Sequence, residues 1–464
     1  MLSSPHPQTC LKSGKLTQTT VSAMPISTTR QGVMADDVRW RVAINHEPFR
    51  ILRFVILAAT AVLLLGCAVF RLHSPPPQKF EPLVQIPGMP GVRAWGDEFS
   101  PVFQQDALAA REQEKHSGLF EKEPIVNVLA ISGGGGDGAF GAGLLCGWTL
   151  SGSRPSFKLV TGVSTGALTA PFAFLGPAYD EKLRQAYTTI SGRDIFLMRS
   201  LLAIVLRPDS LGLNDPLAKL TAEIVDEKML ADVAAEHLKG RRLYISTTAL
   251  DAQRPVVWNM GAIAASGHPK ALSLFRDIMI ASAAIPVAFP PVFLKVEADG
   301  QRFDEMHVDG GVMNQVFLYG SMLDPQEFRN NSNDGLPNRE ARVYVIRNSQ
   351  LKPDWQEVNP RVQSIGPRSI SSLIKAQGIG DLFRIFTTAR RDRLDFHLAF
   401  IPDSLDTNRE DEFDNRVMNL LFDAGYDLAK RGYPWRKAPP GYFPVRNTQN
   451  KNGPSLSDTP TEAH

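Results

Sequence analysis

IVNVLAISGGGGDGAFGAG, the stretch from Ile125 to Gly143, joins an apolar run to a segment in which seven of the thirteen residues from Ile131 onward are glycine. Glycine loses more conformational entropy on folding than any other residue, so a stretch this rich in it needs a physical reason. Three explanations compete. They are a flexible linker, a cradle for the phosphates of a nucleotide, and an anion hole for a reaction intermediate.

The segments on either side of the glycines argue against a linker. Ile125–Ile131 is typical of a buried strand, and AFGAGLLCGWTL, residues 139–150, has the apolar spacing of a helix. A strand, a glycine-rich turn and a helix place bare backbone N–H groups at a helix N-terminus, where negative charge is stabilised. A flexible linker would not be bracketed in this way.

Neither nucleotide-binding motif is complete. The G-x-G-x-x-G spacing from Gly133 to Gly138 also requires an acidic residue roughly 20 positions later to hold a ribose. No Asp or Glu occurs between Asp137 and Asp180. A P-loop requires Gly-Lys-Ser/Thr, and the first lysine after the glycines is Lys158. The anion hole is therefore the favoured explanation.

The next strand–helix junction holds a serine between two glycines. FKLVTGVSTGALTAPFAFLG, residues 157–176, predicts a strand up to about Val163 and then a helix. Gly162 and Gly166 flank Ser164 in the pattern G-x-S-x-G, the nucleophile elbow, in which a sharp turn exposes the serine hydroxyl above the edge of the sheet. The alternative is that Ser164 only caps the helix.

A nucleophilic serine needs a base, and Asp309 is the candidate. Residues 303–308 are typical of a strand, and Asp309 begins the turn Asp309-Gly310-Gly311 at its end. Open α/β sheets build their sites at strand ends. Asp-Gly is also a very common turn pair, so this motif by itself leaves a structural turn as the alternative.

Together, these motifs resemble those of the patatin-like phospholipases. The resemblance spans residues 125–350, and the segments DIMIASAAIPVAFPPV (277–292) and VDGGVMNQ (308–315) also match the family's pattern. It implies acyl-ester hydrolysis without a metal or cofactor, by a Ser–Asp dyad whose nucleophile is Ser164 and whose base is Asp309. It also implies an oxyanion hole at Gly133, Gly134 and Gly135, with Gly138, Gly162, Gly166, Gly310 and Gly311 as the remaining motif glycines.

One residue departs from the family's pattern. Family members carry Arg or Lys just before the last glycine of the loop, and this chain has Asp137 there. A carboxylate then stands where a cation would meet a lipid phosphate. The expectation is that neutral esters are hydrolysed faster than anionic phospholipids.

Two other functions stay open at this point. In an ordinary α/β-hydrolase a histidine follows the acid and completes a triad. His268, His307 and His397 are the candidates for such an esterase or thioesterase, and a structural role is favoured for His307. The other alternative is a non-catalytic surface lipoprotein that uses the same scaffold for binding.

The N-terminal region predicts a membrane tether. Residues 1–46 are rich in Ser, Thr and Gln and are expected to be disordered or to precede the true start. In residues 47–67, two arginines precede the apolar run FVILAATAVLLLG, which ends in LLGC at Cys67. This resembles a bacterial lipobox, in which Cys67 would be lipidated. An uncleaved anchor is the alternative.

The remaining boundaries follow from composition. Residues 68–123 begin with closely spaced prolines and predict an extended linker. Residues 124–350 are expected to form the catalytic domain, 351–446 a helical extension and 447–464 a disordered tail. The expected fold is α/β, with a mostly parallel central sheet flanked by helices and a helical C-terminal region.

The expected partners are a lipid or acyl-ester substrate and a membrane, which the chain meets through its N-terminal anchor. A net charge of +2 gives no indication of a nucleic-acid partner. The expected location is the bacterial cell envelope, with the folded domain outside the cytoplasm.

Overall fold

The computed structural model describes residues 74–189, 197–198, 212–213, 215–324, 327, 339–409 and 411–443. The described strands are β1 (Arg93–Trp95), β2 (Ile125–Ile131), β3 (Leu159–Val163), β4 (Leu197–Met198), β5 (Gly212–Leu213), β6 (Arg242–Ala249), β7 (Arg254–Asn259), β8 (Val292–Ala298), β9 (Gln301–Asp309), β10 (Glu340–Arg347) and β11 (Leu394–Phe400).

The described helices are α2 (Pro101–His116), α3 (Leu119–Lys122), α4 (Gly138–Leu150), α5 (Thr165–Leu175), α6 (Asp180–Thr188), α9 (Asp215–Ile224), α10 (Glu227–Leu238), α11 (Met260–Ala265), α12 (Ala271–Ser282), α14 (Val362–Asp392) and α15 (Asn415–Lys430). Short 3-10 turns are η1 (Gln78–Leu83), η2 (Gly135–Asp137), η3 (Pro177–Tyr179) and η4 (Gly310–Val312).

A sheet of nine strands lies at the centre of the described part of the chain. Five neighbouring strands run parallel, in the order β6–β3–β2–β10–β11. β7 and β1 extend the sheet in antiparallel fashion beyond β6, and the β8–β9 hairpin joins it through β9. The expected α/β fold is confirmed, with a parallel centre and antiparallel additions, and β2 has the bounds that the sequence predicted.

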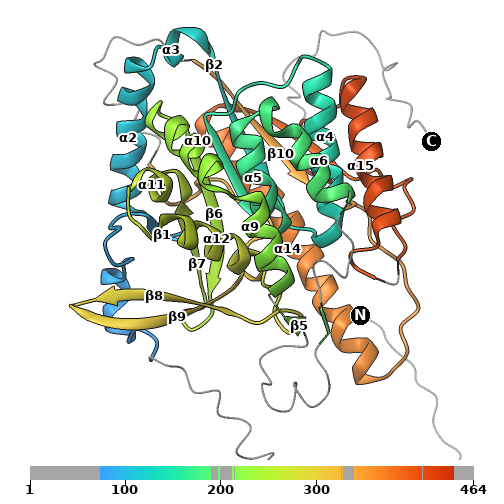
Figure 1. Cartoon of the computed structure of the whole chain (residues 1–464). Helices are drawn as coiled ribbons and strands as arrows, with labels where there is room; N and C mark the ends of the chain where they lie inside the picture. Colours follow the sequence, from blue (N-terminus) through green and yellow to red (C-terminus); the bar gives the residue numbers. More distant parts are fainter. Residues whose placement is uncertain are drawn as a thin grey trace, which may run out of the picture. The chain divides into compact units, whose positions relative to one another are not determined.

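The sheet is buried on both faces, because alternate side chains of a strand point to opposite sides. In β2, Leu129 and Ile131 belong to one core with side chains of α4, α5 and α15, whereas Val128 and Ala130 belong to a second core with α2 and α14. In Figure 1, α4, α5 and α6 lie in front of the parallel strands and α14 lies behind them. Strands covered on both faces are apolar at nearly every position, which made β2 recognisable in the sequence.

Glycines in α4 allow α15 to pack against it at close range. A Cβ on Gly143 would overlap the carbonyl oxygen of Phe422, and one on Gly147 would overlap that of Tyr426. The reverse contact is as tight, because a Cβ on Gly425 of α15 would overlap a carbonyl oxygen of α4. The glycines that follow the turn therefore serve the packing of two helices.

Two strands end against the same edge of β6. β3 pairs with β6 as far as Val163, opposite Ser246, and β9 takes over at the next residue, with Asp309 opposite Thr247. β7 occupies the other edge of β6 over these residues, so β3 and β9 must share one edge. Because β3 runs parallel to β6 and β9 runs antiparallel to it, their C-terminal ends meet. This meeting brings Ser164 and Asp309 together across 145 residues of sequence.

The region predicted as a linker is partly folded, which corrects that prediction. Residues 68–123 contain η1, β1 and α2, and β1 is a strand of the main sheet. The closely spaced prolines suggested an extended chain throughout. β1 is only three residues long and pairs at the margin of the sheet, so it leaves no periodic pattern in the sequence.

The C-terminal region is helical, as expected, and it is also part of the main sheet. Within residues 351–446, α14 and α15 cover the two faces, and β11 pairs with β10 over its whole length. A boundary at residue 350 therefore does not separate an appendage from the fold.

Several predictions concern residues outside the described part of the chain. These are residues 1–46, residues 47–67 with Cys67, and the tail at 447–464. Within the described residues, no helix combines the length and the apolar composition needed to cross a membrane.

Candidate active site

Ser164 occupies the sharp turn between β3 and α5. Its backbone has φ 55° and ψ −126°, a conformation that a residue with a side chain adopts only at a cost. A Cβ on Gly162 would overlap the carbonyl oxygen of Gly166, and a Cβ on Gly166 would overlap that of Ile131. The predicted G-x-S-x-G elbow is therefore present, and close backbone contacts require both of its glycines.

The side chain of Ser164 bonds to Asp309. Its Oγ donates a hydrogen bond to Oδ2 of Asp309 over 2.6 Å. Among the described residues it caps no helix, although it directly precedes α5. The backbone N–H of Ser164 donates to Oγ of Ser282 over 3.0 Å, and that hydroxyl donates to the carbonyl of Ser246 over 2.7 Å. The elbow is thus tied to β6, and the interpretation of Ser164 as only a helix cap does not fit.

Asp309 is buried at the end of β9 with both carboxylate oxygens engaged. Oδ2 accepts the bond from Ser164, and Oδ1 accepts the backbone N–H of Gly311 over 2.7 Å. A Cβ on Gly310 would overlap the carbonyl oxygen of Ser246. Burial raises the pKa of Asp309 to about 7, although both hydrogen bonds act to lower it. A carboxyl group with a pKa near neutrality suits a general base at neutral pH.

The glycine-rich loop lies beside Ser164, but one of its amides is already used. The N–H of Gly133 donates to the carbonyl of Gln315 over 2.9 Å, so it is not available as the oxyanion donor that was expected. Gly134 and Gly135 both have positive φ, 157° and 54°, and a Cβ on Gly134 would overlap the carbonyl oxygen of Asn348. Within the described part of the chain, the amides of Gly134 and Gly135 donate no such bond, so these two stay candidates for the predicted oxyanion hole.

Two polar residues that the sequence did not single out hold the loop in place. Gln315 accepts the bond from Gly133, and its Nε2 donates to the carbonyl of Gly311 over 2.7 Å. Gln315 thus links the glycine-rich loop to the turn that carries Asp309. Asn348 donates its backbone N–H to Oγ of Ser132 and its Nδ2 to the carbonyl of Ser132, over 2.8 and 2.9 Å. A motif segment contained Gln315, but no local pattern links Asn348 to the loop.

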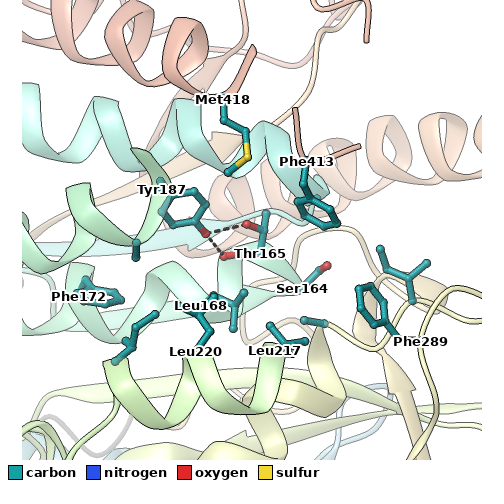
Figure 2. Close-up of a pocket in the computed structure, with 15 residues that line it drawn as sticks. Ser164, Thr165, Leu168, Phe172, Tyr187, Leu217, Leu220, Phe289, Phe413 and Met418 are labelled. Atoms are coloured by element: carbon teal, nitrogen blue, oxygen red, sulfur yellow. Dashed lines mark hydrogen bonds between the residues drawn. The ribbon is translucent and has the colours of Figure 1, made fainter. Parts of the chain in front are cut away.

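An apolar pocket opens beside Ser164 (Figure 2). Its walls come from α5, α6, α9, the segment before β8 and the segment leading into α15. The hydroxyl of Tyr187 is bonded to the Oγ1 atoms of Thr165 and Thr169, over 2.7 and 2.8 Å, so its polar end is satisfied inside the wall. Apolar side chains make up most of the lining: Leu168, Phe172, Ala186, Leu217, Leu220, Ile224, Ala283, Ile285, Phe289, Phe413 and Met418.

The segment that carries Ser164 and Asp309 is similar to a known protein family. Residues 129–319 match the family model of the patatin-like phospholipases. These residues form a patatin-like phospholipase domain. No curated protein matches this chain. Among solved structures, the crystal structure of VipD from Legionella pneumophila is similar over 66% of this chain and 66% of that chain, with 13% identity and a TM-score of 0.29.

The site extends beyond the residues that match the patatin-like family. Asn348, which holds the glycine-rich loop, and Phe413 and Met418, which line the pocket, all follow residue 319. Together with β10, β11, α14 and α15 they complete the sheet and the pocket wall of the patatin-like domain.

The histidines do not complete a triad in the described structure. His307 is fully buried, and its ring bonds to Oγ1 of Thr247 over 2.9 Å and to Oε2 of Glu305 over 2.8 Å. His397 stacks on Tyr344 at the other end of the sheet order, and His268 is a half-buried loop residue. None of the described histidines bonds to the serine or the aspartate, so the geometry favours a dyad over a triad.

The carboxylate of Asp137 is paired. Arg409, which lies 272 residues further along the chain, bonds to Oδ1 of Asp137 and donates to Oε1 of Glu412 over 2.9 Å. Burial raises the pKa of Asp137, and the charge of Arg409 opposes that rise. A cation therefore does stand beside the loop, supplied by a different segment. The Asp137 carboxylate is therefore ion-paired, but Arg409 is shared with Glu412, so one cation faces two carboxylates and the expected preference for neutral esters stays a prediction.

Proposed function

We propose that the patatin-like domain is a serine acyl-ester hydrolase that acts on lipids, with Ser164 as the nucleophile and Asp309 as its base. The observation that carries this proposal is the 2.6 Å hydrogen bond from the Ser164 hydroxyl to Asp309 at the edge of an apolar pocket. The family's name points in the same direction. A Ser–Asp pair without a histidine needs a carboxylate of raised pKa, and burial provides one at Asp309.

The proposed reaction has two stages. Asp309 takes the proton of Ser164 through Oδ2 as Oγ attacks the carbonyl carbon of the ester, and the alkoxide leaves as an alcohol after receiving that proton. The oxyanion of the intermediate lies against the amides of Gly134 and Gly135, and a good donor of this kind is worth roughly 3–4 kcal/mol. In the second stage Asp309 takes a proton from a water molecule as the water oxygen attacks the acyl carbon, and it returns that proton to Oγ as the bond between the acyl carbon and Oγ breaks, which releases the acid and restores Ser164.

The apolar pocket is proposed to hold the acyl chain of the substrate. Its lining offers contact to methylene groups, and each buried methylene is worth about 0.8 kcal/mol. We expect kcat/KM for p-nitrophenyl esters to rise by roughly 10–100-fold from acetate to octanoate, because only part of the longer chain becomes buried. The rates are measured with Ser164→Ala as the blank.

A flat profile across the esters would contradict the assignment of the pocket to the acyl chain. Hydrolysis at the same rate by Ser164→Ala would contradict the proposed function altogether. Running a neutral glyceride and phosphatidylglycerol in the same assay identifies the preferred head group, which the paired charges of Asp137 and Arg409 leave open.

We also propose that Cys67 is lipidated and holds the domain at a membrane of the bacterial cell envelope, outside the cytoplasm. The support is the LLGC sequence after a charged and apolar leader. Labelled palmitate fed to a bacterial host should appear in the protein and in the control Cys10→Ser. Cys67→Ser should be unlabelled and accumulate as a larger precursor. An unlabelled, uncleaved wild-type protein would mean that the segment is a plain anchor.

A further inference from the structure

The first half of α14, residues 362–377, carries an exposed row of aliphatic side chains. We call this segment the α14 arm. Val362, Ile370 and Leu373 expose 87%, 58% and 69% of their surface, and Ile365 and Ile374 are exposed as well. The second half of the helix is different, because its apolar side chains, such as Leu382, are buried against the sheet. In Figure 1 the orange α14 continues from behind the sheet to the lower right, beyond the strands.

The exposed aliphatic residues lie on one side of the α14 arm. At 100° per residue, Val362, Ile370 and Leu373 fall within about 80° of one another, whereas Ser371 lies about 140° from the middle of that group. Lys375 and Arg368 project on the same side as Ser371. The α14 arm is therefore amphipathic, and its apolar side is the open one.

The polar side of the α14 arm is the side that the chain covers. Nη1 of Arg368 donates to Oδ2 of Asp354 over 3.2 Å, and Nζ of Lys375 donates to the carbonyl of Lys352. The segment at 352–354 thus packs along the basic side chains and leaves the aliphatic ones to solvent. A helix of a soluble domain normally buries its apolar side, so this arrangement indicates that another apolar phase meets it.

The α14 arm is joined to the turn that carries Asp309. Nε2 of Gln377, at the end of the arm, donates to the carbonyl of Val312 over 3.3 Å, and one turn later Oδ2 of Asp381 accepts the backbone N–H of Gln315 over 2.6 Å. Val312 itself is an exposed aliphatic residue. The end of the arm is therefore tied by hydrogen bonds to the turn that carries Asp309.

The charge and composition around the α14 arm fit an anionic lipid surface. From Lys352 to Arg384 there are five Lys and Arg residues against three Asp and Glu residues, a net charge of +2. Trp355, just before the arm, is 87% exposed. Helices that lie in a bilayer interface combine aliphatic and tryptophan side chains with a basic polar side.

We propose that the α14 arm lies in the surface of an anionic bilayer, with Leu373, Ile370 and Ile374 among the acyl chains. This contact would hold the Asp309 turn close to the bilayer surface, from which a lipid substrate would enter the site. The inference rests on the proposed function for the identity of that substrate, and it is independent of the N-terminal tether.

The test places a tryptophan on each side of the α14 arm. Leu373→Trp and Ser371→Trp are made in the full chain with Ser164→Ala, which keeps the lipids intact. Both are mixed with vesicles of phosphatidylglycerol and brominated phosphatidylcholine. We expect at least about twofold stronger quenching of the tryptophan at 373 than at 371, because only position 373 faces the acyl chains. The six native tryptophans contribute equally to both variants.

Comparing the two tryptophan variants distinguishes a bilayer from a second copy of the chain as the partner of the α14 arm. Any attachment through the N-terminal segment is the same in both variants and cancels in the comparison. Equal quenching at both positions, or none at either, would overturn the proposal. A blue shift at 373 without vesicles that grows with protein concentration would show that a second copy of the chain covers the arm, and would also overturn it.

A second measurement keeps this inference distinct from the proposed function. With Ser164 intact, Leu373→Ser should lower hydrolysis of anionic vesicles by roughly 5–10-fold and leave a soluble p-nitrophenyl ester unaffected, since the side chain of Leu373 is exposed and its loss leaves no cavity in the fold. Equal loss on both substrates would overturn the interfacial role. If the wild-type chain hydrolysed neither substrate, the proposed function would fail while the quenching result still decided the place of the α14 arm.

Discussion

Replacing Ser164 with alanine should lower ester hydrolysis by on the order of 10⁴-fold or more, the scale seen when a serine hydrolase loses its nucleophile. The Oγ atom that is removed is the donor to Asp309, and the strained backbone at this position exists to present it. A fluorophosphonate probe should label the wild-type protein and leave Ser164→Ala unlabelled. Alanine fits the same turn, so circular dichroism and the melting temperature should change little.

Ser282→Ala is the matched control for this experiment. Ser282 is also a buried serine at the elbow, but its hydroxyl is held between the amide of Ser164 and the carbonyl of Ser246. This variant should still be labelled, at a reduced rate, because loss of the Ser282 hydroxyl loosens the elbow without removing the nucleophile. Labelling that survives in Ser164→Ala and disappears in Ser282→Ala would place the nucleophile at 282.

Replacing Asp309 with asparagine should lower kcat/KM by roughly 10²–10⁴-fold, the usual contribution of a general base. Asparagine keeps the shape of the side chain and can still accept the amide of Gly311, but it cannot take a proton from Ser164. In the wild type, activity should rise with pH and level off above an apparent pKa near 7, because only the ionised carboxylate is a base. His268→Ala and His397→Ala should retain most of the activity. Loss of activity in either variant, with the fold intact, would favour the triad mechanism over the dyad.

The buried carboxyl of Asp309 should make stability fall as pH rises, whereas it makes activity rise. The pKa of Asp309 is higher in the folded chain than the value near 3.9 of an unfolded one, so between about pH 4 and pH 7 the folded state binds more protons. The unfolding free energy should then fall as pH rises through this window, by at most about 4 kcal/mol. Asp309→Asn should melt at a higher temperature than the wild type at pH 8 and at a similar one at pH 4.5. A lower melting temperature at both pH values would contradict the raised pKa.

The local features of the site could be read from the sequence because they obey short-range sterics. The bounds of β2, the turn at Gly134 and Gly135, and the elbow around Ser164 depend on residues within a few positions of one another. Gly134 and Gly135 have positive φ, and a Cβ on Gly162 would overlap the nearby carbonyl oxygen of Gly166, so the local backbone itself requires these glycines. The strand and turn that carry Asp309 were predictable for the same reason.

The pairing of remote segments could not be read in this way, because periodicity reports which side of an element is buried and not what covers it. The meeting of β3 and β9 on one edge of β6, the use of the Gly133 amide by Gln315, and the pairing of Asp137 with Arg409 each join segments far apart in the chain. The sequence by itself predicted Ser164 as the candidate nucleophile and Asp309 as its candidate base. Only the packing of the sheet and its helices established that the two meet, which amides stay free for an oxyanion, and that the C-terminal region completes the pocket.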